Sequence, residues 1–151
     1  MGTLVIAVDP GKTSGVATWD GEKFDSMELD VSSFFDDVHT MIHQAVGRGD
    51  TVRLVSESFI ITVHTAKNTQ ATWSLELIGV LKFFAHAYKL EPLVLQQPST
   101  GKAFGTDAKL RHMGWYRKGM GHANDAARHL LTFMATRKMI PTETLVELAS
   151  A

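Results

Sequence analysis

The sequence predicts an α/β fold whose mixed five-stranded sheet has three antiparallel strands followed by parallel strands, with helices flanking the sheet. An apolar, β-branched run at residues 3–8 indicates a first strand that is buried on both faces. Strand-like segments at 15–19 and 22–29 flank Asp20-Gly21, a typical two-residue hairpin turn, so the first three strands form a meander. Helical and strand patterns then alternate, as crossovers between parallel strands require.

Capping signals and periodicity place the remaining elements. Ser33 and Asp36 have the spacing of a capping box, and the helix that they begin ends at Gly47 and Gly49. The elements predicted after it are a strand at 51–56, a loop at 61–72, a helix at 73–89, a strand at 93–96, a short helix near 106–113, a helix at 122–138 and a last short helix from Pro141. We expect one domain spanning residues 1–151, because neither a repeat nor a linker interrupts this order.

Composition argues against several classes of protein. With 44% hydrophobic and 21% charged residues, the chain of 151 residues has the make-up of a soluble globular domain. No apolar run approaches the roughly 20 residues of a membrane span, and the first residues lack the basic leading region of a signal peptide. The absence of cysteine excludes disulfides, thiol catalysis and cysteine-based zinc sites. We therefore expect a cytoplasmic protein that does not bind membranes.

Charge is unevenly distributed along the chain, although the net charge is only −1. Residues 20–37 contain seven acids and one base, whereas residues 101–138 contain eight bases and two acids. The second stretch can present a basic surface to phosphate groups while the total charge stays near zero. Solvated helix faces would give the same asymmetry, so charge alone leaves nucleic-acid binding open.

Acidic residues stand where apolar strands end. Asp9 follows the first strand and Glu57 follows the strand at 51–56, and burying either acid is costly unless it is paired or binds a metal. Asp125 lies in an apolar helix three residues after His122, on the same helical face. Oxygen ligands without thiolates suit Mg²⁺ or Mn²⁺, and two such ions can activate water and stabilise the leaving oxygen of a phosphodiester. The sequence therefore predicts a two-metal hydrolytic site, with Asp9 bridging the ions.

Each of these four residues also has a simpler interpretation. Asp9 before Pro-Gly can form a turn, and Glu57 can face solvent. Asp125 can lie on the surface of an amphipathic helix, and His122 can be structural. It is their combination that favours catalysis. A nucleotide-binding P-loop is disfavoured, because PGKTSG has Ile6 where the motif needs its first glycine.

Three motifs together resemble those of RuvC-type Holliday junction resolvases. VDPGKTSGVA at 8–17 resembles the family's first motif, an aspartate followed by Pro-Gly and a later glycine. Glu57 resembles the family's second-strand glutamate, and the Ala-Lys-Asn at 66–68 resembles the one that follows it in bacterial members, here at a longer spacing that implies an enlarged loop. HANDAARHLL at 122–131 resembles the last motif, His/Asp-x-x-Asp-Ala. The compact, cysteine-free chain resembles a phage-encoded member.

The resemblance implies an RNase H-like fold, a homodimer and Mg²⁺-dependent nicking of four-way junctions in branched DNA, in the host cytoplasm for a phage enzyme. It assigns two Mg²⁺ ions, for which Mn²⁺ can substitute, to Asp9, Glu57, His122 and Asp125. Lys109 resembles a lysine on the short helix before the last motif and is expected to stabilise transition-state charge. The residues expected to contact DNA are Lys12, Phe59, Lys67, Asn68, Lys102, Lys109, Arg111, Arg117 and Lys118.

Several functions stay open on the sequence alone. Phe59, two residues beyond Glu57, either stacks on unpaired bases of a junction or packs in the core. The same catalytic centre would serve an endonuclease that prefers flaps, forks or bubbles, or an RNase H-type enzyme that cuts RNA in hybrids. A catalytically silent module that binds branched DNA is the alternative outside enzymes. The helix at 73–89 is apolar on more than one face, which fits either the core or a dimer interface.

Overall fold

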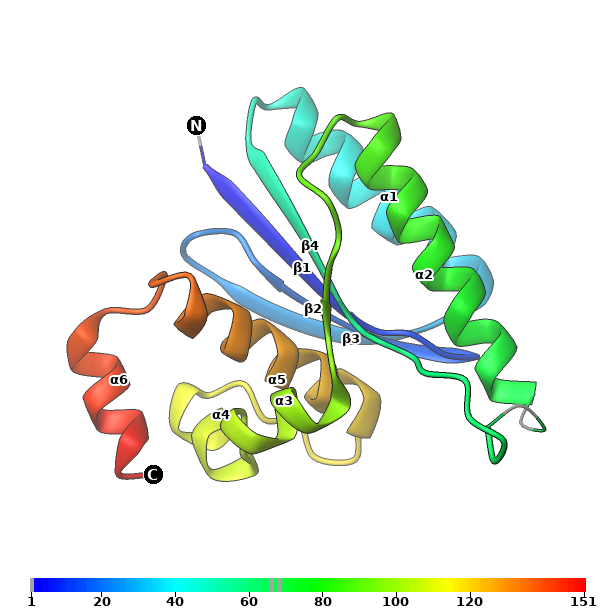
Figure 1. The fold of residues 1–151 in the computed structure, drawn as a ribbon. Coiled ribbons are helices and arrows are strands. Elements are labelled where there is room, and N and C mark those ends of the chain that lie inside the picture. The colour runs from blue at the N-terminus through cyan, green and yellow to red at the C-terminus, as the bar shows by residue number, and fades with distance from the viewer. Residues whose placement is uncertain (1, 66, 68) are drawn as a thin grey trace.

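The structure is a computed structural model that describes residues 2–65, 67 and 69–151 (Figure 1). Its elements in chain order are β1 (Thr3–Asp9), β2 (Thr13–Trp19), β3 (Phe24–Asp30), α1 (Val31–Gly47), β4 (Thr51–Glu57), α2 (Thr69–Ala87), β5 (Val94–Gln96), α3 (Pro98–Phe104), α4 (Asp107–Met113), α5 (Gly121–Thr136) and α6 (Thr142–Ala149). The strands form one sheet in the order β3-β2-β1-β4-β5. β1, β2 and β3 are antiparallel neighbours, whereas β4 is parallel to both β1 and β5. The predicted mixed five-stranded α/β sheet is confirmed.

Helices cover both faces of the sheet: α1 and α2 lie on one face, and α3, α4, α5 and α6 lie on the other (Figure 1). Ile6 and Val8 of β1 belong to the core shared with α1 and α2. Val5 and Ala7 belong to the core shared with α5. Because successive side chains of a strand point to opposite faces, a central strand covered on both sides needs an unbroken apolar run. No helix in the described part of the chain is both long and apolar enough to cross a membrane.

The register of the sheet brings the carboxyl ends of β1 and β4 to the same edge. Val8 pairs with Ser56, so Asp9 and Glu57 come next on adjacent strands. On its other side Asp9 pairs with Gly15 of β2. In open α/β sheets, ligands bind at the carboxyl ends of the strands. The fold therefore places both strand-end acids where a site is expected.

The hairpin between β2 and β3 differs from the predicted two-residue turn at Asp20-Gly21. The Asp20 carboxylate accepts hydrogen bonds from the backbone N–H groups of Glu22 and Lys23, at 2.9 and 2.7 Å. This side-chain bonding holds the chain in a longer loop, and β3 begins only at Phe24. The correction leaves the antiparallel pairing of the two strands intact.

Two helices begin at other residues than predicted, and one helix was not predicted. The N-cap of α1 is Asp30 rather than Ser33, because the Asp30 carboxylate accepts a hydrogen bond from Ser33 N at 2.8 Å. α2 begins at Thr69, inside the segment 61–72 that was predicted to be a loop. α3 was not predicted: it starts with Pro98, whose fixed φ suits a first helical turn, but it spans only seven residues and lacks a clear apolar period.

Candidate active site

Two of the predicted site residues end neighbouring parallel strands. Asp9 ends β1 and Glu57 ends β4. Their side chains are only 15% and 21% exposed. A carboxylate with so little access to water needs a positive or hydrogen-bonding partner, and this requirement makes the edge of the sheet chemically unusual.

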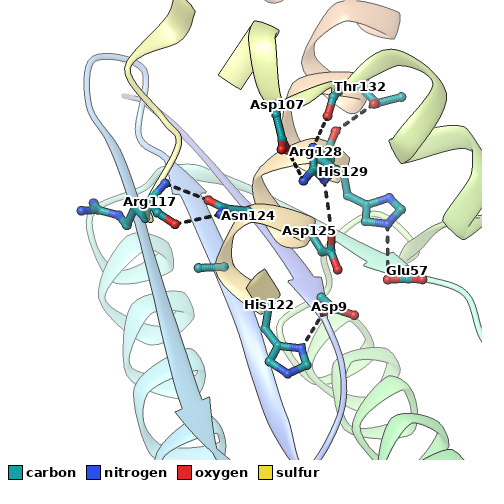
Figure 2. A network of polar contacts seen from close by, with 12 residues as sticks. Asp9, Glu57, Asp107, Arg117, His122, Asn124, Asp125, Arg128, His129 and Thr132 are labelled. Carbon is teal, nitrogen blue, oxygen red and sulfur yellow. Dashed lines mark hydrogen bonds and ion pairs between the residues drawn. The ribbon is translucent and has the colours of Figure 1, made fainter. Parts of the chain in front are cut away.

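The N-terminus of α5 brings His122 and Asp125 to the same edge. Glu28 of β3 accepts a hydrogen bond from His122 N at 3.1 Å, which satisfies one of the N–H groups at the start of the helix. The backbone of His122 also lies directly over Gly15, where a Cβ atom would overlap the His122 carbonyl group. This close approach leaves Nδ1 of His122 3.2 Å from Oδ2 of Asp9 (Figure 2).

An open cavity of about 470 Å³ joins these residues. It is lined by Asp9, Glu57, His122 and Asp125, and Lys12 stands at the same cavity. Figure 2 shows the three carboxylates gathered between the N-terminal half of α5 and the ends of β1 and β4. All four residues singled out from the sequence as metal ligands thus meet at one place in the fold.

The electrostatics of the two strand-end acids are linked. Burial, the hydrogen bond with the Glu57 carboxyl group and the charges of Glu57 and Asp125 raise the pKa of Asp9 to about 9. Burial alone would also raise the pKa of Glu57, but its contacts with His129 and Asp9 outweigh burial and lower that pKa. In the metal-free protein, Asp9 therefore keeps a proton at neutral pH while Glu57 is ionised.

The donor set fits a hard divalent cation such as Mg²⁺ or Mn²⁺. It combines three carboxylates with one imidazole and has no sulfur ligand. A cation would relieve the repulsion that otherwise requires a proton on Asp9. As the side chains stand, no group of three or more histidine, aspartate or glutamate residues in the described chain is close enough together to hold an ion. Binding would therefore need these side chains to close in on the metal.

α5 carries two further polar residues at the site, which the sequence analysis did not single out as site residues. Arg128 forms ion pairs with Asp125 (Nε to Oδ1, 3.2 Å) and with Asp107 of α4 (Nη2 to Oδ1, 2.5 Å). His129 is buried, and its Nε2 lies 3.6 Å from Oε2 of Glu57 (Figure 2). The available signal was their spacing, because residues three and four positions after Asp125 share its helical face.

Lys109, which was predicted to be catalytic, and Lys102, which was predicted only to contact DNA, differ in their surroundings. Lys102 of α3 is exposed, and its positive charge favours the ionised forms of both Asp9 and Glu57. The Nζ of Lys109 instead lies over the ring of Phe104, 4.4 Å from its centre. Of these two lysines, Lys102 is therefore the one whose charge acts on both acids.

The other residues expected to contact DNA are spread over the surface. The Arg111 guanidinium lies over the ring of Tyr116, 4.1 Å from its centre. Arg117 is bonded to Asp25 (3.0 Å) and Ser26 (2.7 Å) of β3, so its head group is already engaged. The side chains of three lysines are exposed: Lys12, Lys67 and Lys118. Asn68 lies outside the described residues.

The segment after β4 forms an apolar margin beside the acids. Phe59 is half-buried and lines a second cavity of about 370 Å³, which shares Asp9 and Glu57 with the first. Beyond it, three aliphatic side chains are at least 60% exposed: Ile60, Ile61 and Val63. Apolar side chains rarely gather on a surface that contacts only water, so this margin indicates a binding surface.

Comparison with solved structures establishes the fold. The structure of T. thermophilus RuvC in complex with Holliday junction substrate matches this chain with a TM-score of 0.57 at 17% sequence identity, over 89% of this chain and 96% of the RuvC chain. The chain has an RNase H-like fold. YeaZ from Pseudomonas aeruginosa has a TM-score of 0.43 at 15% identity, over 74% of this chain and 50% of the YeaZ chain. No protein-family model and no curated protein sequence matches the chain. In this RNase H-like fold, Asp9 ends the central strand of the sheet.

Proposed function

We propose that this chain is a Mg²⁺-dependent endonuclease that cuts phosphodiester bonds in branched DNA, with four-way Holliday junctions as its preferred substrate. The observation that carries the proposal is the cavity lined by Asp9, Glu57, His122 and Asp125 at the carboxyl edge of an RNase H-like sheet. T. thermophilus RuvC, which shares this fold, is seen in complex with a Holliday junction substrate. Residues 1–151 would act as one nuclease domain.

The chain's own residues divide the work of catalysis. Asp9, Glu57, His122 and Asp125 would hold two Mg²⁺ ions, for which Mn²⁺ can substitute, and the bound ions supply an activated water and stabilise charge on the leaving oxygen. Asp9 is the most buried of the three carboxylates and lies on the central strand, so it would be the metal ligand most shielded from water. His122 is oriented by its contact with Asp9, and Arg128 restrains Asp125 by an ion pair.

Selectivity for branched DNA is supported by the apolar margin beside the acids. Ile60 is exposed and lines the cavity that contains Asp9 and Glu57, and Ile61 and Val63 are exposed just after it in the chain. Apolar side chains of this kind insert between base steps and unstack them, and bases at a branch point are already partly unstacked. Exposed Lys102 and Lys118 would meet the phosphate backbone on the side of α3 and the loop before α5.

A homodimer is part of the proposal. α2 buries Leu77 and Leu81 in the core yet leaves Leu75 and Phe83 exposed, so the helix is apolar on two faces. A two-fold dimer that covered the exposed face would present two copies of the cavity to a symmetric four-way junction.

The first test is a cleavage assay on end-labelled four-way junction, flap, fork, linear duplex and RNA–DNA hybrid, with and without Mg²⁺. We expect Mg²⁺-dependent cuts that are confined to branched DNA and fastest on the four-way junction. Asp9→Asn, Glu57→Gln and Asp125→Asn are each expected to abolish cleavage while junction binding is retained, because they remove the ligand charge and keep the shape of the side chain. His122→Ala is expected to lower activity less completely.

The outcomes of this assay separate the alternatives. Faster cutting of flaps or forks would keep the catalytic site and change the substrate, and cutting of the hybrid would indicate an RNase H-type enzyme. Junction binding without cleavage in either Mg²⁺ or Mn²⁺ would contradict the nuclease and leave a binding module.

Lys102 and Lys109 provide a matched pair of variants. Lys102→Ala is expected to slow single-turnover cleavage by about 10- to 100-fold, because it removes the positive charge that acts on Asp9 and Glu57. Lys109→Ala removes a lysine of the same charge that lies over Phe104, and we expect less than about a threefold change. Single-turnover rates on the four-way junction at saturating enzyme provide the measurement. If Lys109→Ala slowed cleavage more than Lys102→Ala, Lys109 would have the role predicted from sequence, the stabilisation of transition-state charge.

A further inference from the structure

His129 is a buried polar residue that has no role in the mechanism proposed above. It lies on α5, one turn beyond Asp125, and is only 3% exposed. Its Nδ1 lies 2.9 Å from Oε1 of Gln96, the last residue of β5. Its Nε2 lies 3.6 Å from Oε2 of Glu57, the last residue of β4. The imidazole thus bridges the ends of two neighbouring parallel strands.

The position of this imidazole is tightly constrained. Gly101 of α3 lies against the ring, and a Cβ atom on Gly101 would come within 2.8 to 3.2 Å of three ring atoms. No larger residue fits there without moving the ring or the helix. Gln96 contacts one ring nitrogen from the strand side, while Gly101 closes off one side of the ring. A side chain held from two directions can orient the group that it touches.

A buried imidazole is unfavourable unless its nitrogens have polar partners. With Gln96 at Nδ1, the remaining nitrogen faces Glu57. The Gln96 amide can be turned over, which exchanges the positions of its oxygen and its NH2 group. The NH2 group of Gln96 then donates to Nδ1 of the neutral ring, and the hydrogen on Nε2 points toward Glu57. The contact therefore suits a carboxylate that must be held in one orientation.

We propose that His129, fixed by Gln96, is a positioning residue that holds the Glu57 carboxylate ready to bind metal. The inference rests on the proposed function, since it assigns His129 a role through a ligand of the proposed site. Residues behind a metal ligand keep it in the binding orientation, and their loss typically weakens metal affinity by about 10- to 100-fold. His129 would thus set the metal concentration at which the enzyme works.

The test compares His129→Leu, which removes both nitrogens at similar volume, with His129→Gln, whose amide can still donate toward Glu57. Mn²⁺ affinity is measured by electron paramagnetic resonance of the free ion, and cleavage of the four-way junction is measured as a function of metal concentration. We expect His129→Leu to weaken Mn²⁺ binding by about 10- to 100-fold and to raise the half-maximal metal concentration for cleavage by the same factor. His129→Gln is expected to recover most of the loss.

Three controls separate the possible outcomes. Melting curves in EDTA check that each variant folds. If His129→Leu does not fold, Gln96→Leu tests the same arrangement from β5, because it removes the side chain that fixes His129. His112→Leu removes a histidine that contacts Glu147 at 3.1 Å and is expected to leave Mn²⁺ binding unchanged. Wild-type Mn²⁺ affinity in both His129→Leu and Gln96→Leu would overturn the inference and leave the nuclease standing. A wild-type protein that neither binds Mn²⁺ nor cuts DNA would overturn the proposed function and this inference with it.

Discussion

Asp9→Asn is expected to raise the thermal stability of the metal-free protein at about pH 8 and to abolish cleavage. The reason is that Asp9 is buried beside Glu57 and Asp125, so its ionised form is unfavourable in the fold. An asparagine has nearly the same shape, needs no proton and carries no charge. The same substitution removes a carboxylate of the proposed metal site, so stability and activity should change in opposite directions.

The sign of this effect follows from the two pKa values of Asp9. In the folded protein the pKa of Asp9 is about 9, well above its ordinary value of 3.8. Between these values the folded chain holds a proton that the unfolded chain has released, so the free energy of unfolding decreases as pH rises. In the wild-type protein, the contribution of Asp9 to the free energy of unfolding is fully present below about pH 4 and is lost progressively up to about pH 9. The asparagine variant does not titrate there, so its advantage should grow with pH.

Melting temperatures in EDTA at about pH 5 and pH 8.5 measure this difference. One unit of pKa separation corresponds to about 1.4 kcal/mol, and each kcal/mol shifts the melting temperature by roughly 2–4 °C in a chain of this size, so a gain of several degrees at the higher pH is expected. Added Mg²⁺ should raise the melting temperature of the wild type and not that of the variant. Asp37→Asn, which removes an exposed acid from α1, is the control and should keep both the wild-type melting temperatures and the wild-type response to Mg²⁺. An Asp9→Asn variant that melts below wild type at both pH values would contradict the account.

The features that sequence predicted correctly are those with local signals. The unbroken apolar run of β1 indicated a strand buried on both faces, and Asp9 at its end indicated an acid at the edge of the sheet. The crossover through α1 then makes β4 parallel to β1, so Glu57 had to reach the same edge. Because the order and direction of the strands follow from these few patterns, the fold class could be predicted, and so could the position of Asp9 and Glu57 at one cavity.

The features that sequence missed depend on contacts between distant segments. His129 follows Asp125 in a helix where its position is that of an ordinary buried residue. No neighbouring residue in the sequence indicates that its partners are Gln96 and Glu57. Arg128 likewise counted only as one of many basic residues until α4 brought Asp107 to it. Side-chain bonding also decided the shape of the loop at Asp20, where a two-residue turn was sterically allowed but the carboxylate stabilised a longer one. Such choices are made by tertiary neighbours rather than by local propensity.

Gly15→Ala is expected to be among the most damaging single substitutions in the chain. Gly15 pairs with Asp9 across β1 and β2, and the N-terminal backbone of α5 lies directly over it. A methyl group there would overlap the carbonyl group of His122, and a backbone obstacle of this kind cannot be relieved by rotating a side chain. The helix would have to move away from the sheet, and it would carry His122 and Asp125 away from Asp9. The later glycine of the first motif is thus explained by a close approach that assembles the site.

We expect Gly15→Ala to destabilise the fold by about 3 kcal/mol or more, with a melting temperature roughly 6–12 °C lower, and to abolish cleavage even where the variant is fully folded. Gly47→Ala is the matched control, because Gly47 is the last residue of α1, has nothing within 4 Å of the added methyl group and lies outside the helix proposed to dimerise. That change should stabilise the protein by up to about 1 kcal/mol, since alanine is the better helix former. Denaturation curves of the two variants should therefore move in opposite directions from wild type. Wild-type stability and cleavage in Gly15→Ala would mean that α5 can leave the sheet at little cost, and the close approach would then have no part in building the site.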